Sequence, residues 1–154
     1  MSIDKDPYVV ALKMLARREL TERQVRERLA RRGYDDNDID AAIARLRSNR
    51  SLDDVRVAGA MARSEVVIKR HGRLRAQRQL EAAGLPASIA RTALDEVFAS
   101  LDQDALIGAA LGRRLRGTRA IEDEAEFRRL YRFLIGQGFE SDLVLKTLKA
   151  RQIK

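Results

Sequence analysis

A short pattern that is typical of a helix end occurs three times in this chain of 154 residues. In each copy an apolar residue is followed four positions later by glycine, and the glycine by an apolar or aromatic residue. The copies run from Leu29 to Tyr34, from Leu80 to Leu85 and from Leu134 to Phe139, with their glycines 51 and 54 residues apart. Glycine is the commonest residue in the left-handed conformation that follows the last helical turn. The spacing therefore predicts three similar helical units in tandem.

Capping residues and apolar spacing predict the helices of each unit. Asp6 followed by Pro7 is typical of a helix start, and Thr21 with Gln24 fits a capping box. Later helices are expected to begin within 35–38, at Ser51, near Asp102 or Asp104, at Asp123 with Glu126, and at Ser141. These signals predict an all-α fold of three tandem three-helix, helix-turn-helix-like repeats over residues 1–50, 51–101 and 102–154.

The apolar positions also predict which face of each helix is buried. In the first helix the expected inner residues are Val9, Leu12, Leu15 and Ala16. In the first helix of the third unit they are Leu106, Ala109 and Ala110. The β-branched run at 66–68 could indicate a strand, but the helical patterns on both sides favour a helix. Gly117, which lies among arginines, is expected to form a loop.

Each predicted unit is too small to bury a large core alone. The units should therefore pack end to end in an elongated, curved array with a long concave face. The first residues contain no apolar signal region, and no apolar run approaches the length of a transmembrane helix. A soluble, cytoplasmic protein is therefore expected.

The residue types needed for most catalytic and metal sites are scarce. The chain has no cysteine, which excludes disulfides, thiolate chemistry and cysteine-based zinc sites. His71 is the only histidine, and we expect it to be a surface or interface residue. Asp53 and Asp54 are adjacent, so on a helix they would point about 100° apart and would not share a substrate. We therefore expect no enzyme activity, no metal and no cofactor.

Positive charge is the main functional signal. The net charge is +8 and the pI is about 10.4, which favours nucleic acid and other polyanions as partners. Most of the 31 basic residues are arginine, which binds phosphates and carboxylates bidentately. GC-rich codon usage is an alternative cause of this bias. The candidate binding residues form four clusters: Lys69, Arg70, Arg73, Arg75 and Arg78; Arg17 and Arg18; Arg31 and Arg32; and Arg113, Arg114 and Arg116.

The clusters can be interpreted in two ways. Any single cluster could be a solvated face in which arginine stabilises the end of a helix. Taken together, and with the net charge, they favour a polyanion or an acidic protein surface as the partner. Aromatic residues make up only 5% of the chain, so base stacking should be minor and sequence-specific reading is not indicated.

Several motifs, in their order and spacing, resemble the RecX family of RecA regulators. The matching segments are 11–22, Leu29 to Gly33, Leu52-Asp53-Asp54 with Arg56 and Ala58, Gly72, Leu80 to Gly84, and Gly138-Phe139. The resemblance covers nearly the whole chain, from about Tyr8 to Arg151. The chain departs from the family pattern at Val57, where an aromatic is usual, at Ala76, which replaces a larger aliphatic, and at Arg73, which replaces a common proline.

The resemblance implies a negative regulator that binds the RecA–single-stranded DNA filament in its helical groove. Such a protein would block filament extension, ATP hydrolysis, strand exchange and coprotease activity, and so regulate recombination, DNA repair and the SOS response. It would bind single-stranded and also double-stranded DNA as a monomer, and would need no covalent chemistry. Two alternatives stay open: a general basic DNA-binding or architectural protein, and a helical adaptor for an acidic protein partner.

Overall fold

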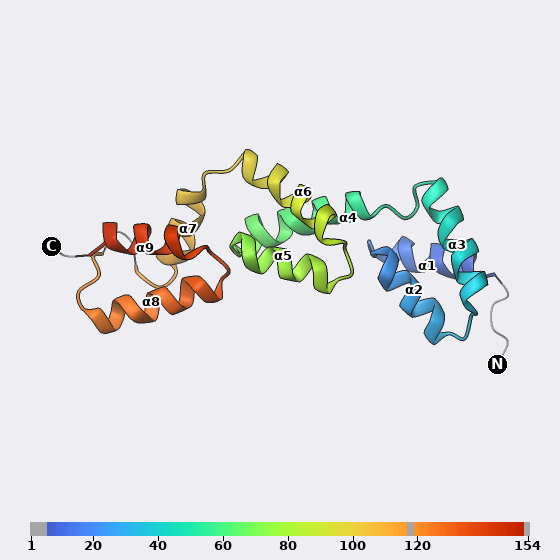
Figure 1. Cartoon of the computed structure of the whole chain (residues 1–154), viewed down its shortest axis with the longest axis horizontal. Helices are drawn as coiled ribbons and strands as arrows, with labels where there is room; N and C mark the ends of the chain where they lie inside the picture. Colours follow the sequence, from blue (N-terminus) through green and yellow to red (C-terminus); the bar gives the residue numbers. More distant parts are fainter. Residues whose placement is uncertain (1–5, 117–118, 153–154) are drawn as a thin grey trace.

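The computed structural model describes residues 6–116 and 119–152, so Gly117 and its expected loop lie outside the described residues. The all-α fold class is confirmed, and the helices lie in a row along the longest axis of the molecule (Figure 1). In the described residues the helices are α1 Pro7–Arg17, α2 Glu22–Arg31, α3 Asp36–Ser48, α4 Asp54–Arg63, α5 Arg73–Ala82, α6 Ala87–Ala99, α7 Gln103–Gly112, α8 Glu124–Gly136 and α9 Ser141–Ala150. A π-helical turn, η1 (Ser64–Ile68), continues α4.

Three separate hydrophobic cores divide these helices into groups. The N-terminal group, α1–α3, packs around Leu29 and Ile43, and the middle group, α4–α6, around Leu80 and Leu94. The C-terminal group, α7–α9, has a core of its own. Leu52, which lies beyond the predicted boundary at residue 50, is part of the N-terminal core. The exact boundaries of the three repeats therefore stay a prediction.

The helix starts follow the predicted caps in most places. Thr21 forms a capping box with Gln24, and Asp6 accepts a hydrogen bond from the backbone of Tyr8 ahead of Pro7. The caps expected at Ser51 and Ser141 are wrong. Asp53 caps α4, because burial of Leu52 holds the preceding residues outside the helix, and α9 starts after Glu140 without a side-chain cap.

The buried face was predicted only in part in two helices that are apolar on several sides. In α1 the buried residues are Val10 and Ala11, while Val9 is 37% exposed. In α7 the buried residues are Ile107, Ala110 and Leu111. Of the predicted residues, Ala110 is buried, and Leu12, Leu15 and Leu106 are partly buried against the cores. A helix with consecutive apolar residues leaves its orientation to the neighbours against which it packs.

The second helices of the three groups, α2, α5 and α8, run head to tail (Figure 1). The C-terminus of α8 meets the N-terminus of α5, and the C-terminus of α5 meets the N-terminus of α2. At the N-terminal junction, between α5 and α2, the Thr21 hydroxyl donates to the carbonyl of Ala83 at 2.6 Å and the Arg23 guanidinium to that of Ala82 at 2.5 Å. Asp54, in the first turn of α4, accepts from the backbone N–H of Glu22 at 2.9 Å. This junction therefore depends on polar side chains.

The C-terminal junction, between α8 and α5, is made by the backbone. The N–H of Gly72 donates to the carbonyl of Gln137 at 2.7 Å, and the N–H of Leu74 donates to that of Gly138 at 3.0 Å. A Cβ atom on Gly72 would lie 2.4 Å from the carbonyl carbon of Gly138. Only glycine therefore allows this close approach of the two chains.

Candidate functional site

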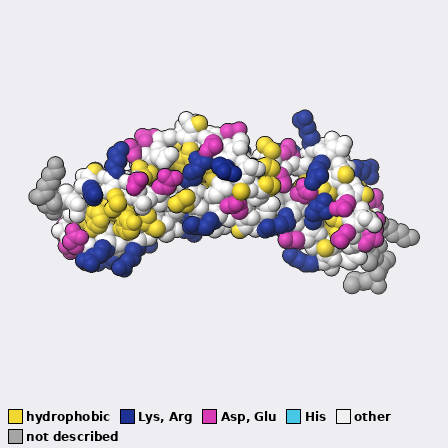
Figure 2. Space-filling view, viewed as in Figure 1, with side chains coloured by type: hydrophobic (Ala, Val, Ile, Leu, Met, Phe, Trp, Pro, Cys, Tyr) yellow, Lys and Arg dark blue, Asp and Glu magenta, His cyan; other side chains and the backbone are white. Residues whose placement is uncertain are grey.

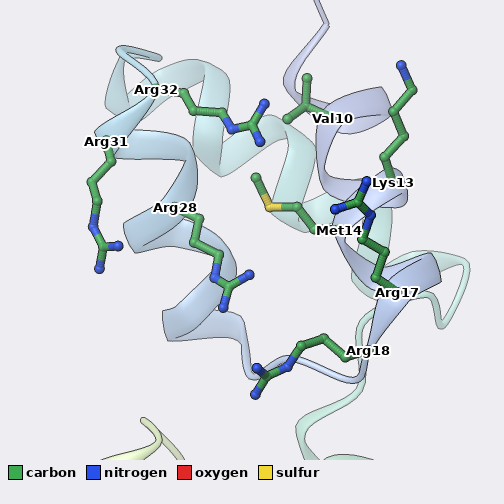
Figure 3. A pocket seen from close by; sticks show the side chains of 8 residues that line it. All are labelled: Val10, Lys13, Met14, Arg17, Arg18, Arg28, Arg31 and Arg32. Atoms are coloured by element: carbon green, nitrogen blue, oxygen red, sulfur yellow. The ribbon is translucent and has the colours of Figure 1, made fainter.

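A groove between α1 and α2 brings two of the predicted arginine pairs together. Its cationic residues are Lys13, Arg17, Arg18, Arg28, Arg31 and Arg32, and its volume is about 700 Å³. Val10 and Met14 of α1 form an apolar floor between the two rows of cations (Figure 3). We call this the basic groove. The predicted residues at 17, 18, 31 and 32 thus belong to one surface instead of two.

Helix geometry explains the two rows of cations. Arg28 lies three and four residues before Arg31 and Arg32, so all three project from neighbouring positions at the end of α2. In Figure 3, Arg28 and Arg18 approach the same end of the groove from opposite sides, while Arg31 points outward. Cations at these helix ends also interact favourably with the helix dipoles. Sequence reasoning missed Arg28, although its spacing to the predicted pair was visible.

The arginines of the basic groove lack acidic partners. In the part of the chain that the structure describes, Arg17, Arg18, Arg28, Arg31 and Arg32 take part in no ion pair. Other arginines of the same helix group are paired: Arg26 with Glu22 and Asp40, and Arg47 with Glu22. The groove therefore concentrates uncompensated positive charge, which an external polyanion would neutralise.

A second basic surface lies beside the C-terminal junction. Lys69, Arg70, Arg113 and Arg114 line a cleft of about 190 Å³ together with Ala110, Phe133 and Gln137. The Arg114 guanidinium lies 4.3 Å from the centre of the Phe133 ring. We call this the junction cleft. It joins part of the predicted cluster at 69–78 with part of the cluster at 113–116.

The buried carboxylate of Glu65 lies next to the junction cleft. It accepts hydrogen bonds from Lys69 Nζ at 2.9 Å and from His71 Nδ1 at 2.6 Å. Burial acts to raise the pKa of Glu65, but the hydrogen bonds from His71 and Lys69 outweigh it, and the pKa lies below its ordinary value. The side chain of His71 is 13% exposed, because this hydrogen bond holds the ring against the fold, so of the two expected locations an interface fits better than an open surface.

The other predicted residues are spread over different surroundings. Arg73 pairs with Asp95 and lies over the ring of Phe98, and Arg75 donates to the carbonyl of Gly136 at the C-terminal junction. Arg78 and Arg116 are exposed outside both basic surfaces. Figure 2 likewise shows Lys and Arg side chains at several separate places along the molecule. The cluster at 69–78 is therefore not one surface.

The described residues offer little for other kinds of chemistry. They contain no group of three or more histidine, cysteine, aspartate or glutamate side chains that could hold a metal ion. None of the helices in the described ranges is long and apolar enough to cross a membrane. The described surface is distinguished instead by the basic groove, whose arginines form no ion pair with the described acidic residues.

Comparison with known proteins identifies the family. A family model described as the first three-helix domain of RecX matches residues 8–46. The regulatory protein RecX of Acidithiobacillus ferrooxidans is 33% identical over 146 residues, which cover 94% of this chain and 90% of the relative. This chain belongs to the RecX family. The regulatory protein RecX of Chlorobaculum tepidum is 31% identical over 90% of this chain and 84% of its own length.

Solved structures agree with the fold of this RecX chain. The crystal structure of RecX from Lactobacillus salivarius superposes with a TM-score of 0.76 at 18% identity, covering 94% of this chain and 93% of the other. Another crystal structure of a regulatory protein RecX gives a TM-score of 0.78 at 20% identity, over 94% of this chain and 70% of the other. The family places this chain among regulatory proteins, as the motifs in its sequence indicated.

Proposed function

We propose that this chain is a negative regulator of the RecA recombinase that binds the RecA–single-stranded DNA filament in its groove. The observation that carries the proposal is the basic groove, whose five arginines form no ion pair within the described residues, in a chain that belongs to the RecX family. Binding blocks filament extension, ATP hydrolysis, strand exchange and coprotease activity without covalent chemistry. The protein works as a cytoplasmic monomer and needs no cofactor.

The basic groove contacts phosphates of the DNA in the filament. Its cations lie in two rows on either side of an apolar floor, which suits one extended strand better than a flat protein surface. No aromatic side chain lines the groove, so the contacts are independent of base sequence. The same contacts allow weaker binding to double-stranded DNA.

The head-to-tail row of helix groups suits this role. An elongated molecule can contact several places along a filament, and the three repeats, proposed to span residues 1–50, 51–101 and 102–154, would each face a different place. Arg78 and Arg116, which lie outside both basic surfaces, would contact acidic faces of RecA. Weak contacts at several places together give a high overall affinity.

The direct test is RecA ATP hydrolysis on single-stranded DNA with increasing amounts of the purified chain. The proposal expects inhibition at a near-stoichiometric or lower ratio to RecA. Tight binding to duplex DNA without any effect on RecA would instead indicate an architectural DNA-binding protein. Absence of DNA binding at low salt would indicate an adaptor for an acidic protein partner.

A further inference from the structure

The connection between α4 and α5 combines three features that cost free energy. Residues Ser64–Ile68 form a π-helical turn, Arg70 has a φ of 60°, and Glu65 is only 4% exposed. Turns of π-helix and left-handed residues other than glycine are unfavourable and are frequent at functional sites. Their combination at one connection points to a functional role for it.

These features hold two cations in place. The Glu65 carboxylate binds Lys69 and His71, and the N–H groups of these two residues donate to the carbonyls of Ser64 and Glu65 at 2.9 Å each. Arg70 is thus fixed between two anchored neighbours, and its left-handed backbone directs the chain back toward α5. Lys69 and Arg70 both line the junction cleft.

The cleft spans two helix groups. Lys69 and Arg70 come from the middle group, whereas Arg113 and Arg114 follow the end of α7 in the C-terminal group. Gln137, whose carbonyl accepts from Gly72 at the C-terminal junction, lines the same cleft. None of the described residues that line it carries a carboxylate, and the carboxylate of the nearby Glu65 already accepts hydrogen bonds from Lys69 and His71. A ligand in the cleft would therefore contact both groups.

We propose that the junction cleft is a binding site for a backbone phosphate of single-stranded nucleic acid, and that the bound phosphate ties the middle group to the C-terminal group. Cations from different elements converge on a small cleft, and the oxygens of a tetrahedral phosphate, unlike those of a planar carboxylate, do not lie in one plane with their central atom. Arg114 covers one face of the Phe133 ring, so that face is not open to a base. The inference deepens the proposed function, but its test needs no RecA.

The test compares two substitutions at matched positions. Arg70 and Arg50 are the described non-glycine residues with positive φ, at 60° and 59°, and only Arg70 lines the cleft. Glycine tolerates this backbone conformation, so both Arg70→Gly and Arg50→Gly should fold and melt at or above the wild-type temperature. Binding of fluorescein-labelled oligo(dT) is measured by anisotropy over a range of salt concentrations. Arg70→Gly should weaken binding by about tenfold and reduce the salt slope by about 0.7, as expected for one lost phosphate contact.

Equal loss of binding in both variants would overturn the site, because any removed charge would then have the same effect. Poly-glutamate serves as the competing acidic ligand. If it binds more tightly than oligo(dT) and depends on Arg70 more strongly, the ligand is an acidic protein and the phosphate assignment is wrong. Inhibition of RecA by the wild-type chain is measured separately, so failure of this site and failure of the proposed function can be told apart.

Hydrogen exchange tests the tie between the groups. The amides of Gly72 and Leu74 donate across the C-terminal junction, so a bound phosphate should slow their exchange. We expect oligo(dT) to protect both amides in the wild type and in Arg50→Gly but not in Arg70→Gly. Unchanged exchange in the wild type at saturating oligo(dT) would overturn the proposed tie.

Discussion

The two junctions between helix groups join similar helix ends by different chemistry. The N-terminal junction depends on the side chains of Thr21, Arg23 and Asp54, which meet the end of α5 and the start of α2. The C-terminal junction depends on backbone N–H groups of Gly72 and Leu74 that donate directly to the end of α8. A side chain at a junction can change its conformation to accommodate a substitution, whereas a backbone segment that is hydrogen-bonded directly to its neighbour has less freedom to move.

The glycines at the ends of α5 and α8 show the consequence. Gly84 and Gly138 both have positive φ, of 102° and 96°. The three atoms nearest to a Cβ on Gly84 would be the Cβ, Nε and Cδ of Arg23, at 2.6, 2.7 and 3.2 Å, whereas a Cβ on Gly138 would lie 2.3 Å from the Cβ and 2.4 Å from the backbone nitrogen of Arg75. The C-terminal junction should therefore be the less tolerant of the two.

The largest expected effect is that of Gly138→Ala. Left-handed backbone strain and the clash with Arg75 together should lower the free energy of unfolding by about 2–4 kcal/mol. Gly84→Ala should cost about 1–3 kcal/mol, because the Nε and Cδ atoms of Arg23 can move away, while its Cβ can move only with the backbone. Urea unfolding measures both. Gly136→Ala is the control: its Cβ would meet nothing within 4 Å, and it should stabilise the helix by about 0.5–1 kcal/mol.

If Gly84→Ala were as costly as Gly138→Ala, the difference between the two junctions would not exist. If neither variant were destabilised, the helix ends would not lie against their neighbours as described.

The next effect concerns the side chains of the N-terminal junction. Thr21→Val keeps the shape of a fully buried residue but removes the cap of α2 and the hydrogen bond to Ala83. The expected loss in the free energy of unfolding is about 1–2 kcal/mol. Thr92→Val, on the exposed face of α6, should change it by less than about 0.5 kcal/mol. Equal urea midpoints for these two variants would show that the Thr21 hydroxyl does not hold the junction.

Lowering the pH should increase the difference in stability between the two junctions. Hydrogen bonds from His71 and Lys69 outweigh burial and lower the pKa of Glu65, so its contribution to stability is present above the ordinary value of 4.5 and is lost as the pH falls below it. Arg47 and Arg26 lower the pKa of Glu22 in the same way, against its burial. Burial raises the pKa of Asp54 above 3.8, so its contribution is present at low pH and is lost as the pH rises through the folded-state pKa.

At the N-terminal junction the lowered pKa of Glu22 and the raised pKa of Asp54 thus have opposite effects on stability. Beside the C-terminal junction, the lowered pKa of Glu65 has no such opposing shift among the described residues. Between pH 5 and about pH 3, hydrogen exchange at Leu74 should therefore accelerate more than exchange at Glu22, after correction for the intrinsic rates. Glu65→Gln should remove much of this difference. Faster opening at Glu22 than at Leu74 in the wild type would contradict the account.

The sequence predicted the features that depend on local chemistry. The glycines that end α2, α5 and α8 have positive φ as expected, and the Thr21 capping box is present, because both depend on a few adjacent residues. The orientation of α1 and α7 was predicted only in part, since each has apolar residues on more than one side. The π-helical turn that contains Glu65 also gives no signal in the spacing of apolar residues, because it depends on contacts made after folding.

The candidate site was predicted in part for the same reason. Composition and clustering indicated a basic surface, but they could not show that Arg73 pairs with Asp95 while Arg17 and Arg28 stay unpaired. Which charges remain free depends on the acids that folding brings near. The role of Arg75 at the C-terminal junction was hidden too, because the close approach of Gly138 is a long-range contact.

Removing positive charge from the basic groove should have the smallest effect on stability. A variant of this kind also tests the central claim, that the groove binds the filament. In one variant Arg17, Arg18, Arg28 and Arg32 are replaced by alanine. In the control, Arg63, Arg91, Arg129 and Arg132, which lie outside both basic surfaces, are replaced by alanine. Both variants lose the same charge, and each single substitution should change the free energy of unfolding by at most about 0.5 kcal/mol.

The deciding measurement is RecA ATP hydrolysis on single-stranded DNA, titrated with the wild type, the groove variant and the control. The account predicts inhibition by the wild type and the control at similar concentrations, and a need for about tenfold more of the groove variant. Inhibition by the groove variant at the wild-type concentration would contradict the claim that this groove binds the filament.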